Sequence, residues 1–334
     1  MEKPLVSFII PIYNVAPYLE KCISSVLNQS FGDYEIIAVN DGSPDNCGAI
    51  LEELCSRDSR VRVVTKQNGG LSSARNAGIA ASEGSWLYFL DGDDSLLPDS
   101  IGNVIPYLDD RYDVVMTDVG SADQHSEENG VRVAVSNDLD LAGEFDAIGW
   151  TVFCVWGKFY RKEVLMQNNL WFDEKMIGNE DQAFELSLLG VTNRLLVLNN
   201  QTYDYNIHAG SISHTTRDPR VEMGIYEYYC RYLDKNPVIV ESSVLFCNMF
   251  VGYAVYKRLE GLSLDRKAAE MRKVMANPFV IQALSKVSFT QKDKMLVCRC
   301  IRKKTTTSLI VLFRLKNAAR KAMPVFDCVK KLTR

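Results

Sequence analysis

The sequence predicts an α/β fold whose mainly parallel sheet is flanked by helices. Short β-branched apolar runs alternate with segments of helical spacing, and the alternation recurs several times in the first 120 residues. The first pair is a strand over 5–13 and then a helix, whose apolar positions are Leu19, Cys22, Ile23, Val26 and Leu27. With 334 residues and 47% apolar side chains, the chain can bury a full core.

The later elements are expected from the same alternation. Strands are expected over 34–40, 61–65, 85–90 and 113–117, and helices over 46–57, 71–82 and 98–108. Repeated strand–helix units form parallel sheets that are covered on both faces. After a polar loop over 119–140, short mixed elements are expected to about 190, a strand-like segment over 191–206, and a helical extension at the C-terminus.

Charge is distributed unevenly along the chain. The net charge is -4, but residues 291–334 hold 13 basic and 2 acidic side chains, whereas residues 1–290 hold 25 basic and 40 acidic ones. The tail mixes these charges with apolar residues, as an interfacial helix on an anionic membrane does. A helix packed on the acidic body of this chain or of a second subunit is the alternative; no nucleic-acid-binding module is recognisable.

Cysteines and apolar runs bear on the compartment. The nine Cys are scattered and none is spaced as Cys-x-x-Cys, so neither a zinc site nor a disulfide framework is expected. No stretch approaches the ~20 apolar residues of a membrane span, and no leader pattern opens the chain. We therefore expect a cytoplasmic protein, for which the tail offers peripheral attachment to the membrane.

Polar residues follow four of the expected strands. They are residues 11–14, 40–43, 68–70 and 91–94. Ligands of parallel sheets bind at the carboxyl ends of the strands, so these four segments are expected to converge on one site.

Acidic residues stand in two of the four segments. The cluster Asp91-Gly92-Asp93-Asp94 suits Mg²⁺ or Mn²⁺ holding a diphosphate, since such ions take one or two carboxylates and fill the rest with phosphate oxygens and water. The alternative is a turn in which Asp94 caps a helix. Asp41 could accept a hydrogen bond from a base or a ribose hydroxyl, or form an Asx turn.

A Gly pair precedes the helix expected over 71–82. Gly69 and Gly70 let the backbone approach a ligand closely. Arg75 lies in the first turn of that helix, where the helix dipole disfavours a cation, so we expect it to pair with a phosphate or a nearby Asp. The alternative is an ordinary surface Arg.

In order along the chain, VSFIIPIYN, IIAVNDGSPD, NGGLSSARNAG and YFLDGDD resemble the motifs of family 2 glycosyltransferases. The resemblance implies a GT-A fold, inversion at the anomeric carbon, a nucleotide-sugar donor of the UDP-hexose type, and a Mn²⁺ or Mg²⁺ site at Asp91 and Asp93. Which of Asp91, Asp93 and Asp94 binds the metal directly stays open. The remaining donor-binding residues implied are Pro11, Tyr13, Asn14, Asp41, Gly70, Arg75, Asn76 and Gly92.

The second half of the chain is similar to bacterial capsule and O-antigen members in two segments, VWGKFYRKEVL and WFDEKMIGNEDQAFELSLL. The resemblance implies that Asp181 is the general base that takes the proton of the acceptor hydroxyl. The plainer alternative is a first-turn carboxylate that favours the helix dipole. His208, in TYDYNIHAGSISHTT, matches a residue that approaches the diphosphate; a structural His is the alternative.

Together these patterns divide the chain into a nucleotide-sugar-binding half over 1–120, an acceptor-binding and catalytic half over 121–215, and a helical extension with a basic tail over 216–334. The function expected is transfer of a sugar to a glycan or lipid-linked acceptor in bacterial surface polysaccharide synthesis. A non-catalytic nucleotide-sugar-binding component of an assembly complex is the alternative. A sugar-phosphate nucleotidyltransferase is disfavoured because PIYNVAPYL is not its Gly-rich, Arg-containing loop.

Overall fold

The computed structural model describes residues 3–117, 153–176, 178–192, 194–198 and 200–206. All of them belong to the first of two units into which the chain divides, residues 1–228. The predictions for the loop over 119–140, for the helical extension, for the basic tail and for His208 lie outside the described residues.

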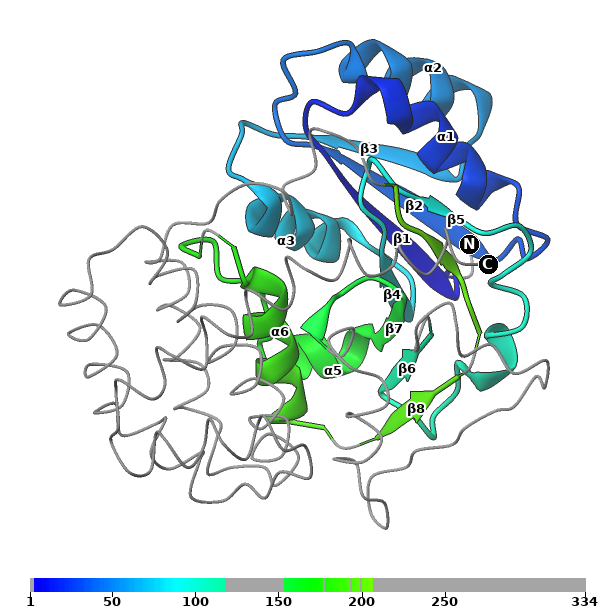
Figure 1. Ribbon diagram of the computed structural model, residues 1–334, viewed down its shortest axis with the longest axis vertical. Coiled ribbons are helices and arrows are strands. Elements are labelled where there is room, and N and C mark those ends of the chain that lie inside the picture. The colour runs from blue at the N-terminus through cyan, green and yellow to red at the C-terminus, as the bar shows by residue number, and fades with distance from the viewer. Residues whose placement is uncertain (1–2, 118–152, 177, 193, 199, 207–334) are drawn as a thin grey trace, which may run out of the picture. The chain divides into compact units, whose positions relative to one another are not determined.

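A seven-stranded sheet forms the centre of the described part (Figure 1). Its strand order is β3-β2-β1-β4-β7-β6-β8, and only β7 runs antiparallel to its neighbours, so the predicted mainly parallel sheet is confirmed. Strands from both predicted halves of the domain share this sheet. The strands are β1 Val6–Ile12, β2 Tyr34–Asn40, β3 Val61–Thr65, β4 Trp86–Phe89, β6 Val114–Met116, β7 Lys158–Arg161 and β8 Leu195–Val197.

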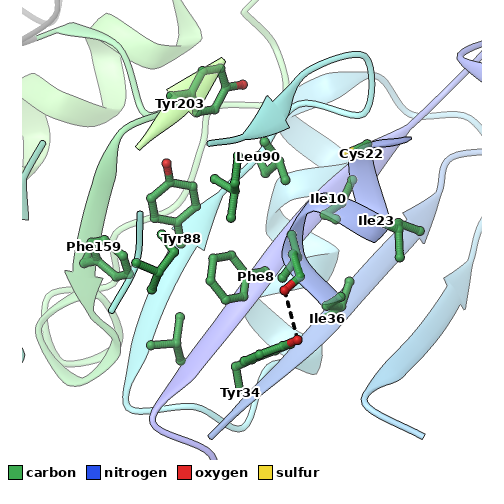
Figure 2. Packing of buried hydrophobic residues seen from close by; sticks show 14 of the residues in the cluster. Phe8, Ile10, Cys22, Ile23, Tyr34, Ile36, Tyr88, Leu90, Phe159 and Tyr203 are labelled. Atoms are coloured by element: carbon green, nitrogen blue, oxygen red, sulfur yellow. Dashed lines mark hydrogen bonds between the residues drawn. The ribbon is translucent and has the colours of Figure 1, made fainter. Parts of the chain in front are cut away.

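Helices cover both faces of the sheet, as Figure 1 shows. Helices α1 (Ala16–Leu27) and α2 (Cys47–Arg57) pack on one face, where Phe8 and Ile10 join the buried cluster drawn in Figure 2. Helices α3 (Leu71–Ala81) and α6 (Glu180–Leu189) lie on the other face. There Phe89 of β4 contacts Phe184 of α6, with ring centroids 6.2 Å apart. The short helix α5, Lys162–Gln167, follows β7 directly.

At Gly78 the backbone of helix α3 packs directly on the Ile9 side chain of β1. A Cβ atom built on Gly78 would lie 2.2 Å from Cγ2 of Ile9. Close helix–strand packing of this kind needs a glycine, and it fixes the height of α3 over the sheet. The first turn of α3 therefore has a defined position at the carboxyl edge.

The helix predicted over 98–108 is wrong. The segment instead makes turns and a 3₁₀ helix, Ile105–Tyr107. Ile101, Val104 and Leu108 are buried at helical spacing, which explains the prediction. Pro106 has no N–H to continue an α-helical ladder, and most of the observed bonds, such as that from Val104 N–H to the Ile101 carbonyl at 2.8 Å, reach only three residues back.

The strand-like segment 191–206 forms two short strands in different sheets. One is β8 of the main sheet, and the other is β9, Tyr203–Asp204, which pairs antiparallel with β5, Ser95–Leu96. This second pairing holds the chain after residue 200 against the loop that follows β4.

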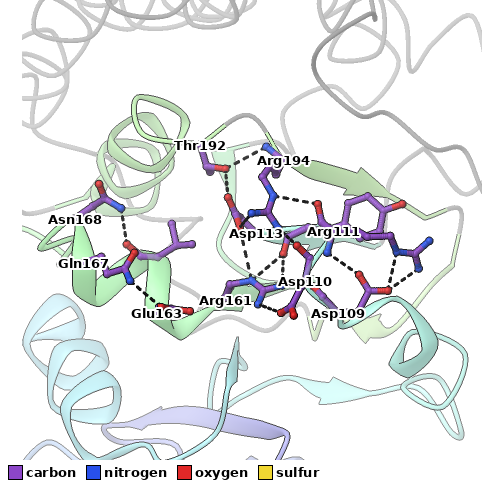
Figure 3. Close-up of polar contacts among 12 residues, drawn as sticks. Asp109, Asp110, Arg111, Asp113, Arg161, Glu163, Gln167, Asn168, Thr192 and Arg194 are labelled. Atoms are coloured by element: carbon purple, nitrogen blue, oxygen red, sulfur yellow. Dashed lines mark hydrogen bonds and ion pairs between the residues drawn. The ribbon is translucent and has the colours of Figure 1, made fainter.

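The opposite edge of the sheet carries a polar network of its own (Figure 3). Asp113 is buried just before β6; it accepts a hydrogen bond from the Thr192 hydroxyl at 2.5 Å and lies 3.6 Å from guanidinium nitrogens of Arg161 and Arg194. These residues stand at the amino ends of β4 and β6, away from the four polar strand ends.

Candidate active site

The four polar segments do meet at one edge of the sheet. Parallel register places Ile12 opposite Asn40 and Asn40 opposite Thr65, so the residues after β1, β2 and β3 emerge side by side. Tyr13 is 50% exposed there. Asn14 has a left-handed backbone, with φ of 56°, and its N–H donates to the Ser43 hydroxyl at 2.7 Å.

Asp41 organises the glycine loop before α3. Its carboxylate accepts hydrogen bonds from the Lys66 ammonium at 2.5 Å, from Gly69 N–H at 3.0 Å and from Gly70 N–H at 2.8 Å. Gly70 has a φ of 87°, which a side chain would strain. Asp41 is 2% exposed, and its contacts in the structure hold this loop in place. Its ion-pair partner Lys66 is not among the residues predicted from the motifs. The available signal was a basic residue directly after the strand over 61–65.

Arg75 joins the two halves of the site. Its guanidinium, 1% exposed, donates to Asp91 at 3.0 Å and to Asp181 at 2.6 Å, and it lies 3.7 Å from Glu180. Burial acts to lower the pKa of Arg75, but the three carboxylates raise it above its ordinary value, so the group stays charged. The predicted pairing of Arg75 with a nearby Asp is present twice.

The loop after β4 directs its carboxylates differently. Asp94 is buried and accepts hydrogen bonds from the Tyr203 hydroxyl at 2.6 Å and from Asn206 N–H at 2.8 Å. Burial, with the charges of Asp91 and Asp93, raises the pKa of Asp94 to about 7. Asp94 thus fastens the chain around β9 to this loop, whereas Asp91 faces Arg75.

Two neighbours complete the same loop. Gly92 lies against the end of β1, where a Cβ atom would come 2.9 Å from the Pro11 carbonyl oxygen. The Tyr203 hydroxyl also accepts a hydrogen bond from Asp91 N–H at 3.2 Å, and the Tyr203 ring stacks on Trp156 with centroids 5.0 Å apart. Tyr203 was not singled out from the sequence, where its place in a Tyr-rich strand was the only signal.

Asp181 stands in the first turn of α6, facing Arg75. Burial raises its pKa to about 7; Glu180 and Asp91 add to the rise, and Arg75 opposes it. A carboxylate with a pKa near the working pH is suited to take a proton. Asp181 is therefore a candidate base, and it contacts the same guanidinium as Asp91.

Asn76 links α3 to the acceptor half of the chain. Its side-chain amide donates to the Phe172 carbonyl at 2.9 Å, and its oxygen accepts from Phe172 N–H at 2.9 Å. The same amide donates to Glu174 at 3.0 Å. Contact with a donor nucleotide stays a prediction for Asn76; the contact observed joins two protein segments.

The carboxylates after β4 fit a metal ion whose coordination is completed by the oxygens of a bound diphosphate. Within the described residues, no three His, Cys, Asp or Glu side chains come together as a ready metal site. Mg²⁺ and Mn²⁺ do not need one, because one or two carboxylates suffice when a diphosphate supplies further oxygens. Asp93 and Asp91 are the predicted ligands.

Among the helices of the described part, none is long and apolar enough to cross a membrane.

Comparisons with known proteins identify the family of the chain. The family model described as Glycosyl transferase family 2 matches residues 7–167. A Bacillus subtilis protein, the uncharacterized glycosyltransferase EpsJ, is 34% identical over 237 residues, which cover 68% of each chain. The chain belongs to glycosyltransferase family 2. The putative glycosyltransferase EpsH of the same species is 27% identical over 89% of this chain and 91% of its own.

Solved structures confirm the GT-A fold of this family 2 member. The S. aureus protein TarS, residues 1–349 in complex with UDP-GlcNAc, matches with a TM-score of 0.71 at 18% identity, covering 94% of this chain and 92% of that one. A mannosyltransferase from Pyrobaculum calidifontis, in complex with GDP-Man and Mn²⁺, matches with a TM-score of 0.52 at 14% identity, over 95% and 88% of the two chains.

Proposed function

We propose that this protein transfers a hexose-type sugar from a UDP-sugar to a hydroxyl of a glycan or lipid-linked acceptor, with inversion of the anomeric carbon, in bacterial surface polysaccharide synthesis. One observation carries the proposal: a single buried guanidinium, that of Arg75, contacts both Asp91 after β4 and Asp181 on α6. Arg75 thereby links a carboxylate proposed for the donor side to the carboxylate proposed as the proton acceptor.

The donor side is built from the strand ends. Tyr13 is exposed at the edge where a base or ribose could lie, and the loop held by Asp41 carries the N-terminus of α3. Asp91 and Asp93 are the proposed ligands of Mn²⁺ or Mg²⁺, whose charge would offset that of the departing diphosphate. Asp94 is the least suited of the three, since both its oxygens are engaged by Tyr203 and Asn206.

The acceptor side depends on Asp181. In an inverting transfer, a carboxylate on the face of the sugar opposite the diphosphate takes the proton of the acceptor hydroxyl as the new bond forms. Arg75 fixes the carboxylate of Asp181 at 2.6 Å, and burial keeps its pKa near neutrality. Asp181 is thus held in place and close to the basicity that the step requires.

The names of similar proteins favour the surface-polymer context. The Bacillus subtilis minor teichoic acid biosynthesis protein GgaB is 30% identical over 60% of this chain, although this match covers only 23% of GgaB. TarS has been solved with UDP and with UDP-GlcNAc. A UDP-sugar donor is the first choice for testing on these grounds.

A panel of nucleotide-sugars with Mn²⁺ or Mg²⁺ tests the proposal. We expect nucleotide release and thermal stabilisation with a UDP-sugar, and loss of both with a chelator. Proton NMR of the glycosidic product distinguishes inversion from retention. If no nucleotide-sugar binds, the proposal fails; if one binds with no transfer to any acceptor extract, the non-catalytic binding component becomes the better interpretation.

The proposed base has its own test. Asp181→Asn keeps the shape of the side chain and a hydrogen-bond acceptor for Arg75. We expect donor binding to be retained while transfer falls by about 10² or more, the usual effect of losing a general base. Normal turnover by this variant would remove Asp181 from the mechanism.

A further inference from the structure

A buried ion pair lies one helical turn from Asp181. Lys158 opens β7 and Glu185 lies on α6; Nζ of Lys158 is 3.1 Å from Oε1 of Glu185, and their side chains are only 2% and 4% exposed. Tyr160 stands two residues further along β7, on the same face of the strand, and donates its hydroxyl to the same carboxylate. Neither the motifs nor the proposed mechanism assigns a role to Lys158, Tyr160 or Glu185.

Stability is a poor reason for this pair. Burying two charges costs several kcal/mol per ion before their attraction is counted, and well-packed apolar residues are often as stabilising or more so. Helix α6 is otherwise anchored by apolar side chains, since Phe184 stacks on Phe172 with centroids 4.2 Å apart and Leu188 is buried. An apolar residue at position 185 would continue that packing.

Position along the helix suggests what the pair does. Asp181 and Glu185 are four residues apart, so their side chains lie on the same face of α6, one turn above the other. The start of α6 has no side-chain cap, because Asn179 adopts a left-handed backbone and makes no capping hydrogen bond from its side chain. The start of α6 is held through side chains, by Arg75 at Asp181 in the first turn and by β7 at Glu185 in the second.

We propose that Lys158, Tyr160 and Glu185 are positioning residues for the base: they fix the rotation and height of α6 so that Asp181 meets Arg75 and the acceptor hydroxyl. This inference rests on the proposed function. Hydrophobic burial is non-directional, whereas an ion pair with a second donor specifies which atoms of α6 and β7 must meet. Burial and the charges of Glu185 and Asp181 raise the pKa of Tyr160, so its hydroxyl stays protonated and remains a donor.

A paired substitution separates position from stability. Lys158→Met/Glu185→Met removes both charges of the pair together, and Tyr160 can donate to the Val155 carbonyl, 3.1 Å away. We expect an unfolding midpoint equal to or above that of the wild type, an unchanged Kd for the UDP-sugar, and a fall in kcat of about tenfold to a hundredfold, as displacement of a catalytic group by about 1 Å produces. An unchanged kcat would overturn the inference.

Two further variants guard the interpretation. Lys158→Gln/Glu185→Gln keeps a hydrogen bond between β7 and α6 without charge, and we expect it to restore most of the lost kcat; no recovery beyond the Met pair counts against positioning. Tyr160→Phe removes one hydroxyl from the network and tests the same idea if the Met pair does not fold. We expect a smaller fall in kcat with the donor Kd unchanged, and wild-type kcat would overturn the assignment of Tyr160.

The control removes a buried negative charge far from the site. Asp113→Asn weakens the network with Thr192, Arg161 and Arg194 at the other edge of the sheet (Figure 3), so it should lower the unfolding midpoint and leave kcat alone. An equal fall in kcat in this variant would show that activity follows stability, and would overturn the positioning role.

A measurement without turnover keeps the inference distinct from the proposed function. If the wild type transfers no sugar, the proposed function fails, and hydrogen exchange over 180–189 still reports on α6. We expect faster exchange near Ala183, whose N–H donates to the Asn179 carbonyl at 3.0 Å, in the Met pair than in the wild type. Equal protection would mean that apolar packing alone holds the helix.

Discussion

Replacing Arg75 with Met removes the cation that contacts Asp91, Asp181 and Glu180 together. Breaking a buried, hydrogen-bonded ion pair by deleting one partner costs about 3 to 5 kcal/mol. Arg75 is 1% exposed, but its partners are 28%, 23% and 15% exposed and can recover some hydration. We therefore expect a loss near the lower end, about 3 kcal/mol at pH 8.

The loss in Arg75→Met should depend on pH. In the wild type, burial raises the pKa of Asp181 and Arg75 opposes the rise. A carboxyl with a raised pKa stabilises the fold at acidic pH and loses that contribution as pH rises through its folded pKa. Without Arg75 the pKa of Asp181 climbs further. Below pH 6 this carboxyl is protonated in both proteins, so the share of the loss that Asp181 carries is small. Above pH 7 only the variant must bear an unpaired Asp181 charge or keep its proton, so the loss is larger there.

Urea unfolding followed by tryptophan fluorescence at pH 5.5 and pH 8 measures both quantities. The control is Arg57→Met, which breaks an ion pair with Glu53 that is 59% and 60% exposed and should cost less than about 1 kcal/mol at either pH. An equal loss at the two pH values, or a loss at pH 8 no larger than that of the control, would refute the electrostatic account of Arg75.

Three other predictions follow from the site, the packing and the tail. Because Asp181 must be ionised to accept a proton and its pKa is raised to about 7, kcat/KM should rise with pH through neutrality, and this limb should disappear in the residual activity of Asp181→Asn. Gly78→Ala should cost about 1 to 3 kcal/mol in urea unfolding because its Cβ would lie 2.2 Å from Ile9, whereas Gly32→Ala, with open space around the new Cβ, should stay within about 0.5 kcal/mol of the wild type. Truncation after about residue 290 should abolish co-sedimentation with anionic vesicles if the basic tail binds membranes; unchanged partitioning would favour a tail packed on protein.

The sheet and its helices could be predicted from the sequence because local pattern and tertiary burial agree there. The run 34–40 was expected as a strand, and β2 covers those residues with every one buried. The same reasoning failed at 98–108, where buried Ile101, Val104 and Leu108 imitate a helix face while Pro106 and the turns around it decide the backbone. Apolar spacing reports burial, and burial alone does not distinguish a helix from a series of turns.

The sequence predicts the parts of the site that depend on residues close together in the chain or at neighbouring strand ends. Asp41 and Asp91 were expected at one edge because strand ends converge, and they do. The contacts of Asp94 with Tyr203, 109 residues later, and of Lys158 with Glu185 depend on β9 and β7 pairing with strands distant in the chain. No periodicity encodes such pairings, so these residues emerge from the fold.

Helix α3 carries two adjacent residues that face different tasks. Arg75 reaches the carboxylates of the site, and Asn76 binds the backbone of Phe172 from both sides. When the donor and acceptor halves of related transferases are recombined, α3 is therefore the element whose contacts join the two halves. A crossover placed after residue 81 separates both side chains from the segment 172–181 that they fasten, so a productive chimaera must import compatible partners at 172 and 181 or carry its own α3 along with its acceptor half.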